Sequence, residues 1–239
     1  MPAIASAQTD EIQVYNGELT EPGKFSLTWH HNFTPIGLKE PTFPGGLVSD
    51  KAFIGVPEWS YGVTKWFDMA LYMPLYSITK NHGATLNGFK LRTMFAVPNA
   101  DQRTFVYGVN FEYSYNATQW EPKRFSSEIR PIIGWHLRGT ELMFNPIMDT
   151  EYNGIKNFDF APASRVSHRF SPKWTFGLEE YGDYGPLRSF HPARQQSHQL
   201  YFVADHPAKG WDIEAGVGVG MTAGSDKLTL KLMLSRDLN

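Results

Sequence analysis

Apolar side chains recur at every second position along much of this chain, and this pattern constrains its fold more than any other feature. Residues 210–234 read GWDIEAGVGVGMTAGSDKLTLKLML, with apolar side chains of one parity on both sides of a short AGSD segment. The other parity carries Asp212, Glu214, Lys231 and three glycines. A period of two is typical of a strand with one apolar and one polar face. This stretch therefore predicts two strands joined by a turn.

The same alternation divides most of the chain into strand-length runs. We expect strands at about 24–34, 58–65, 68–79, 87–97, 103–115, 127–138, 141–148, 156–170, 174–184, 196–206, 211–222 and 226–238. Twelve is an even number, and strands of about ten residues are long enough to cross a bilayer at a tilt. The pattern predicts an all-β chain folded as a transmembrane antiparallel up-and-down β-barrel.

The lengths of the connections support a barrel in a membrane. Every second link is short, as at 65–67, 139–140 and 171–173, whereas most of the others are longer and the first covers about 35–57. Outer-membrane barrels alternate short periplasmic turns with longer outer loops in this way.

Aromatic residues make up 15% of the chain, and their placement separates a membrane barrel from a soluble one. Trp66, Phe67, Trp174 and Trp211 flank expected short turns. We expect a second belt at the other strand ends, made of Trp59, Tyr76, Tyr113, Tyr115, Trp120, Tyr181 and Tyr184. Two such belts are typical of the two membrane–water interfaces. The alternative is a soluble β-sandwich or lipocalin-like barrel, in which these rings would lie inside.

Composition narrows the function and the domain organisation. The formal net charge of −2 argues against a nucleic-acid partner, and the lack of cysteine excludes thiol chemistry and cysteine-ligated metals. The histidines show no metal-binding spacing, so we expect neither a cofactor nor a metal site. Residues 1–10 are interpreted as the tail of a removed signal peptide or a disordered N-terminus. Residues 11–239 form one expected barrel domain.

Several segments resemble uncharacterised bacterial outer-membrane barrels described as transporter-like or as "meta-pathway phenol degradation" barrels. The segments that carry the resemblance are EIQVYNGELTEPGKFSLTWHHNF (11–33), FPGG (43–46), PEWSYGVTKWFDMALYMPL (57–75), KLRTMFAVP (90–98), EIRPIIGW (128–135), FNPIMD (144–149) and DFAPASR (159–165). The resemblance spans nearly the whole chain and implies an outer-membrane barrel. It implies no catalytic chemistry.

The polar parity of the strands supplies the candidate pore-lining and solute-binding residues. They are Lys90, Arg92, Glu112, Glu128, Arg130, His136, Arg138, Arg165, Arg169, Glu179, Glu214 and Lys231. One interpretation is a polar constriction that selects solutes by size and charge. The other is a ladder of paired charges that fills a narrow barrel and makes it rigid. Gly216, Gly218 and Gly220 share this face, which indicates that a solute or large side chains come close to the strand.

Prolines interrupt several of the expected strands. Pro131, Pro146 and Pro162 lie in three successive strands, and Pro74 lies in another. A hairpin turn at 138–141 brings Pro131 and Pro146 to similar heights. Since proline cannot donate a ladder hydrogen bond, the wall could be open there and give a hydrophobic solute a lateral exit into the membrane. The alternative is a set of β-bulges that bend a small barrel.

Catalytic patterns are absent from the sequence, although a catalytic triad need not be local in a sequence. His136 faces the expected lumen near Glu112 and Glu128, which would suit a base with an orienting acid or an ordinary hydrogen-bonded histidine. We therefore keep an outer-membrane hydrolase of lipid, lipopolysaccharide or peptide as an alternative function.

The sequence favours a passive outer-membrane channel for small solutes, including hydrophobic or aromatic ones. A barrel with a closed lumen and a structural or binding role is the other alternative. The expected location is the bacterial outer membrane. The expected partners are outer-membrane lipid and lipopolysaccharide, the barrel assembly machinery and a small-molecule solute.

Overall fold

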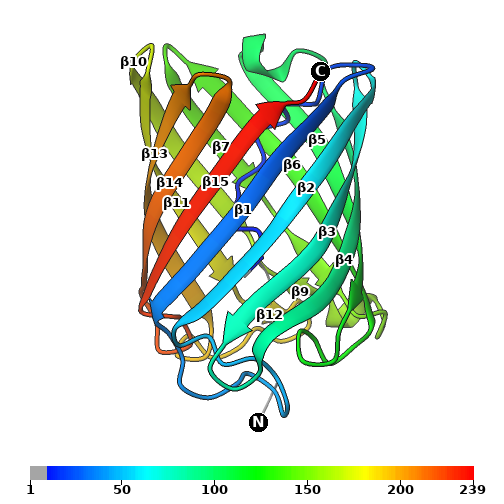
Figure 1. Cartoon of the computed structure of the whole chain (residues 1–239), viewed down its shortest axis with the longest axis vertical. Helices are drawn as coiled ribbons and strands as arrows, with labels where there is room; N and C mark the ends of the chain where they lie inside the picture. Colours follow the sequence, from blue (N-terminus) through cyan, green and yellow to red (C-terminus); the bar gives the residue numbers. More distant parts are fainter. Residues whose placement is uncertain (1–9) are drawn as a thin grey trace.

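The computed structural model describes residues 10–239, which form a closed antiparallel β-barrel (Figure 1). Each wall strand pairs with its neighbours along the chain, and the last strand pairs with the first to close the sheet. The strands are β1 Phe25–Ile36, β2 Ala52–Thr64, β3 Phe67–Thr79, β4 Gly83–Ala96, β5 Phe105–Asn116, β6 Phe125–Leu137, β7 Thr140–Asn145 with β8 Met148–Thr150, β9 Asp159–Phe160 with β10 Ala163–Ser171, β11 Trp174–Asp183 with β12 Gly185–Pro186, β13 Ser197–Ala208, β14 Trp211–Gly220 and β15 Leu228–Asp237. The predicted twelve-stranded barrel is confirmed, with three wall strands each divided into two segments. Short 3₁₀ turns lie at Ala100–Gln102 (η1) and Ile155–Asn157 (η2).

Within residues 10–239, no helix is long and apolar enough to cross a membrane.

The apolar parity of the strands faces outwards and the polar parity faces the lumen. Val217 and Leu230 are 48% and 38% exposed, whereas Glu112 and Arg130 are 2% and 1% exposed. A soluble barrel or sandwich would reverse this arrangement, since its apolar face would pack in the interior. The soluble alternative is therefore wrong, and the outer surface is one that lipid can solvate.

The second strand differs most from its predicted bounds. It begins at Ala52, six residues before the predicted start, and the loop before it covers only 37–51. Pro57 suggested a loop, but in the structure it lies inside the strand opposite Trp29 of β1. On its other side the pairing with β3 passes from Gly55 to Glu58 through an irregularity, so the missing N–H of Pro57 lies where the ladder is already interrupted.

The two ends of the barrel carry different connections. Two-residue turns at 65–66, 138–139, 172–173 and 209–210 and the longer segment 97–104 lie at one end, here called the short-turn end. The other end, here called the loop end, carries connections such as 37–51, 117–124 and 187–196. In outer-membrane barrels the short turns face the periplasm and the longer loops face outwards.

The predicted aromatic belts are only partly correct. Trp66 and Tyr113 are 52% and 53% exposed on the outer surface. Trp120 and Tyr181, by contrast, are buried. Trp120 packs against a cluster that includes Tyr72 inside the barrel, and the Tyr181 hydroxyl donates a hydrogen bond to Glu179. A ring at a strand end can point to either side, so position along the strand did not decide its facing.

The N-terminal segment runs inside the barrel, which the sequence did not predict. Figure 1 shows the first described residues (dark blue) passing through the lumen before the chain turns into β1 at the short-turn end. We call residues 10–22 the strap. Ile12, Val14 and Tyr15 of the strap belong to the largest cluster of buried apolar residues. The predicted signal-peptide tail covers residues 1–10, of which 1–9 lie outside the described residues. Its last residue, Asp10, is 3% exposed and lies inside the barrel.

The glycines of β14 make room for side chains of the neighbouring strands. A Cβ on Gly218 would lie 2.3 Å from the Tyr201 ring, and one on Gly216 would lie 2.9 Å from Val203 and 3.0 Å from Lys231. The neighbours β13 and β15 supply these side chains. Of the two explanations left open by the sequence, close packing of large side chains is therefore the one that the structure supports.

Candidate functional site

The lumen holds two networks of buried charges, and the first lies along β2 to β4. Arg92 is 3% exposed and contacts carboxylates from two other strands, with distances of 3.0 Å from its Nε to Glu58 and 3.1 Å from its Nη2 to Asp68. The Ser60 hydroxyl donates to Glu58, and His30 lies 3.4 Å from the same carboxylate. Alternation places these side chains inwards, and the barrel brings strands that are distant in the sequence within ion-pair distance.

Charged side chains of the strap extend the first network towards β6. Lys90 Nζ lies 2.6 Å from Asp10 and 3.5 Å from Glu112. Arg130 Nε lies 2.6 Å from Glu128, whereas Arg130 Nη1 is 3.6 Å from Glu11. The first two strap residues thus lie between basic groups of the wall.

Polar contacts also hold the backbone of the strap. Asn145 of β7 accepts a hydrogen bond from the Tyr15 N–H at 2.7 Å and donates one to the Tyr15 carbonyl at 3.0 Å. Lys231 donates to the Ile12 carbonyl at 3.1 Å, and Arg130 donates to the Gln13 carbonyl at 3.2 Å. These contacts satisfy backbone groups that would otherwise be buried without partners. The strap is therefore bound to the wall from several sides.

The second network lies along β10 to β15. Arg165 contacts Glu179 at 2.6 Å and both Asp205 and Glu214 at 2.5 Å. Lys231 is 3% exposed and lies 2.5 Å from Glu179 and from Glu214. Arg165 and Lys231 are thus shared among the carboxylates of Glu179, Asp205 and Glu214.

Most of the sequence-predicted site residues lie in these two networks. Those brought together in the lumen are Lys90, Arg92, Glu112, Glu128 and Arg130 in the first network and Arg165, Glu179, Glu214 and Lys231 in the second. They are buried or half-buried and form ion pairs with one another, with other wall residues and with the strap.

Three predicted residues lie elsewhere. Arg138 is exposed in the 138–139 turn with a left-handed φ of 49°, because the hairpin closes there instead of continuing the strand. Arg169 is exposed near the short-turn end of β10. His136 bonds to Glu141 at 3.0 Å and to the Arg103 carbonyl at 2.8 Å. The expected pairing of His136 with Glu112 and Glu128 is wrong, because those carboxylates lie towards the other end of the barrel.

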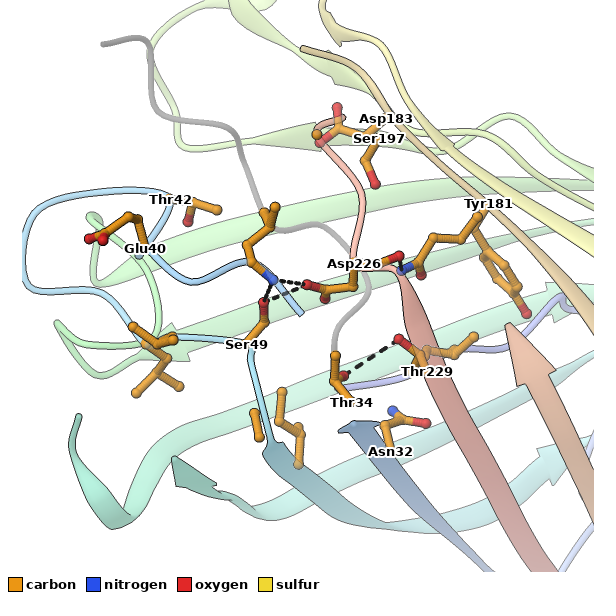
Figure 2. Close-up of a pocket in the computed structure, with 18 of the residues that line it drawn as sticks. Asn32, Thr34, Glu40, Thr42, Ser49, Tyr181, Asp183, Ser197, Asp226 and Thr229 are labelled. Atoms are coloured by element: carbon orange, nitrogen blue, oxygen red, sulfur yellow. Dashed lines mark hydrogen bonds between the residues drawn. The ribbon is translucent and has the colours of Figure 1, made fainter. Parts of the chain in front are cut away.

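A cavity of about 120 Å³ lies inside the loop end of the barrel. Figure 2 shows polar side chains that line it, including Asn32, Thr34, Asp183 and Thr229. The lining also contains apolar side chains, namely Ile12, Leu38, Phe43, Leu47, Val48, Ile54 and Trp120. The cavity is therefore amphipathic, and Ile12 of the strap forms part of its lining.

Loop 37–51 is fixed beside this cavity by two carboxylates. Asp226 accepts hydrogen bonds from the Leu38 N–H at 2.8 Å and the Ser49 hydroxyl at 2.5 Å (Figure 2). Lys39 and Lys80 each lie 2.5 Å from Asp50, and their hydrogen bonds hold the pKa of that carboxyl well below its usual range. The loop is thus joined to β3–β4 and β14–β15 connections on both sides of the cavity.

The three prolines of the hypothesised lateral gap lie in one row across the wall. Pairs of β6 with β7 and β8 run from Ile133–Phe144 to Ile129–Met148, and this register puts Pro131 directly opposite Pro146. In the same way, Ala163–Asn145 and Phe160–Met148 put Pro146 opposite Pro162. Residues 130–132 form no pairs with β7 or β8, and residues 145–147 form none with β6, although 130–132 stay paired with β5. Two facing prolines have no N–H to exchange, which explains the interruption.

The register also separates this interruption from a bulge. Equal numbers of residues lie between the flanking pairs on both strands, so β6 and β7–β8 are not offset by an extra residue. A bulge does occur beside it, where 182–184 of β11–β12 face 161–162. Pro74 also lies at a register shift, between β3 and β4. The bulge interpretation therefore fits Pro74 and Pro162 but is wrong between Pro131 and Pro146.

Apolar side chains line the lumen behind the proline row. Ile132, Ile147 and Ala163 are each fully buried there and belong to the same cluster as Val14 of the strap. The ladder is therefore interrupted where the inner surface is apolar. Elsewhere the lumen holds the two charged networks together with other apolar side chains, such as Val203 and Ile54.

Sequence reasoning missed several residues of the lumen. They are Asp10, Glu11, Tyr15, His30, Glu58, Asp68, Tyr72, Asn145 and Asp205. Glu58 and Asp68 lie at the edges of predicted strands, and their parity could have placed them inside. The strap residues could not be assigned to the lumen by alternation, because a segment outside the sheet has no regular order of inward and outward side chains.

Comparisons with known proteins agree on the fold. No protein-family model and no curated protein sequence matches the chain. Among solved structures, the COG4313 outer membrane channel from Pseudomonas putida F1 has 11% sequence identity and a TM-score of 0.62, and the match covers 95% of this chain and 100% of that chain. The KdgM porin has 9% identity and a TM-score of 0.58, covering 90% and 99% of the two chains. The NanC porin has 8% identity and a TM-score of 0.58, covering 90% and 100%.

At these identities the likeness concerns the fold, which is that of bacterial outer-membrane channels and porins. With the exposed apolar face of the strands, it places the protein in the bacterial outer membrane. The narrower resemblance to "meta-pathway phenol degradation" barrels stays a prediction, as do the lipopolysaccharide and assembly-machinery partners.

Proposed function

We propose that this barrel is a passive channel for small solutes and that hydrophobic or aromatic solutes leave it sideways, through the proline row. The interruption between Pro131 and Pro146 is the observation that carries the proposal. The similarity to outer membrane channels and porins supports the passive role.

The strap supports a lateral route over an axial one for apolar solutes. It crosses the lumen between the two charged networks, and its side chains and backbone are bound by Lys90, Asn145 and Lys231. Passage of an uncharged aromatic solute along the barrel axis is unfavourable, since it would displace buried ion pairs without replacing their contacts. The wall behind Ile132 and Ile147 offers an apolar inner surface beside a missing ladder segment.

The test restores the ladder. Replacing Pro131, Pro146 and Pro162 together with valine returns three N–H donors to the row. We expect entry of a small apolar probe such as phenol into proteoliposomes to fall at least about tenfold, because a paired wall leaves no gap. Ion conductance in planar bilayers should stay unchanged. The matched control is Pro207→Val, on β13 away from the row.

Two results would refute the proposal. Undiminished phenol entry in the triple variant would remove the lateral route. A folded wild-type barrel without ion conductance or solute entry would instead favour a closed structural barrel or an enzyme, and detection of the intact barrel by heat-modifiable migration in gels would exclude misfolding as the cause.

A further inference from the structure

Acidic groups outnumber basic groups in the lumen. Ten carboxylates of the strap and the inner wall form ion pairs there with only five lysine and arginine side chains. The carboxylates are Asp10, Glu11, Glu58, Asp68, Glu112, Glu128, Glu141, Glu179, Asp205 and Glu214. The basic residues are Lys90, Arg92, Arg130, Arg165 and Lys231.

Each basic side chain is already shared by at least two carboxylates. Lys90, for example, contacts Asp10 and Glu112, and Lys231 contacts Glu179 and Glu214. No positive charge in these two networks is therefore left to attract an anion. A passing cation, by contrast, meets oxygen atoms with free lone pairs.

The excess is concentrated in one row across the wall. Register places Glu112 opposite Glu128, and Glu128 opposite Asp149. Among residues 10–239, the Oδ2 atom of Asp149 has no hydrogen-bond partner. Adjacent carboxylates on neighbouring strands repel one another unless a cation or a proton lies between them.

Glu11 provides an independent indication. Its side chain is 1% exposed, and neither of its carboxylate oxygens has a hydrogen-bond partner within the described part of the chain. The nearest cationic group is Arg130, at 3.6 Å, and that guanidinium is already bound to Glu128 at 2.6 Å. A buried carboxylate that lacks hydrogen bonds is unfavourable unless a cation or a proton compensates its charge.

We infer that the lumen selects for cations over anions, with Glu11 and Asp149 as selectivity-determining residues. This inference rests on the proposed channel function and assigns the charge class of its solutes: neutral or positively charged molecules pass and anionic ones are rejected. Rings of carboxylates confer cation selectivity by the same electrostatic mechanism in other pores.

Reversal potentials in planar bilayers under a KCl gradient test the inference with the full chain. We expect K⁺ to be at least about threefold more permeant than Cl⁻ in the wild type. The double variant Glu11→Gln, Asp149→Asn should bring the ratio towards one, because it removes the negative charges of Glu11 and of the unsatisfied Asp149 Oδ2 and leaves the ion pairs of the other carboxylates intact. The control is Asp101→Asn, in the exposed 97–104 segment at the short-turn end.

A second measurement uses solutes of equal size and different charge. Entry of benzylamine, benzyl alcohol and benzoate into proteoliposomes should be slowest for benzoate, by about threefold or more. Steady conductance with a permeability ratio of one or below in the wild type would overturn the inference and leave the channel function standing. Absence of any conductance from a folded barrel would instead refute the channel function. An unchanged ratio of K⁺ to Cl⁻ permeability in the double variant would show that Glu11 and Asp149 do not determine the selectivity.

Discussion

Two parts of the barrel wall share the same alternation but differ in their hydrogen bonding. Between β13 and β14 the ladder runs without interruption from Gln199–Gly220 to Ala208–Trp211. Between β6 and β7–β8 three residues on each strand lie outside the ladder around Pro131 and Pro146. Behind the first wall Glu214 takes part in an ion-pair network beside the apolar Val203, whereas Ile132 and Ile147 behind the second are both apolar. Alternation thus decides which face meets lipid, whereas the distribution of N–H groups decides whether the wall is closed.

The charged side of this comparison should be the more sensitive to substitution. Lys231→Met leaves Glu179 and Glu214 without their shared ammonium, which is fully buried. Removing one partner of a buried ion pair costs about 3–5 kcal/mol. Urea unfolding of the detergent-solubilised barrel, followed by heat-modifiable migration, measures the loss. The control is Lys227→Met, at an exposed residue in the connection just before β15, which should change the free energy of unfolding by less than about 0.5 kcal/mol. Equal losses of stability in both variants would contradict the role of the ion-pair network.

Amide hydrogen exchange compares the two walls directly. The N–H groups of Ile129, Ile133 and Met148 belong to the ladder pairs that flank the interruption, whereas those of Val217 and Tyr201 lie in continuous pairing. We expect the first group to exchange on the order of 100-fold faster, because local opening there breaks fewer hydrogen bonds. Similar protection of both groups would mean that the proline row is closed by contacts other than the ladder.

A proline placed in the continuous wall should reproduce the interruption. Val217→Pro removes one backbone N–H donor from β14, the strand that pairs with β13 on one side and β15 on the other. The carbonyl that loses its donor stays unpaired within the membrane-embedded wall, which costs about 2–3 kcal/mol. Val217→Ala is the control, since it keeps the N–H. If the two variants unfold at the same urea concentration, continuity of the ladder contributes little to this wall.

The smallest expected effect concerns the loop that leads into the interrupted wall. Burial raises the pKa of Glu121, in loop 117–124, to about 7, and this carboxyl accepts a hydrogen bond from Asn116 at 2.8 Å. Because the folded pKa lies above that of an unfolded glutamate, stability should fall as pH rises from about 4.5 to 7 and stay lower above it. With partial solvent screening this amounts to on the order of 1 kcal/mol. Thermal unfolding at pH 5 and pH 8 measures it, and Glu121→Gln should abolish this part of the difference.

Much of the wall could be predicted from the sequence, because each strand carries its own period of two. Phe111 and Ile133 are assigned to the outer face and Glu112 and Arg130 to the lumen by parity alone. The proline positions were also readable, and the hairpin at 138–139 was enough to bring Pro131 and Pro146 to the same height. Whether that row is a bulge or an interruption depends on the register on both sides, which no single strand specifies.

The contents of the lumen could not be predicted in the same way. Arg165 and Glu214 are 49 residues apart, and their contact depends on barrel curvature and strand tilt. The strap is the clearest case: Asp10 and Tyr15 reach Lys90 and Asn145 only because the barrel closes around them.

By itself, the sequence determined the number of strands, their facing and the membrane as solvent, since these follow from local alternation that every residue carries. Only the tertiary structure decided which charges pair, where the strap lies and where the ladder stops. Those features depend on distances between segments remote in the chain, and such distances are set when the sheet closes on itself.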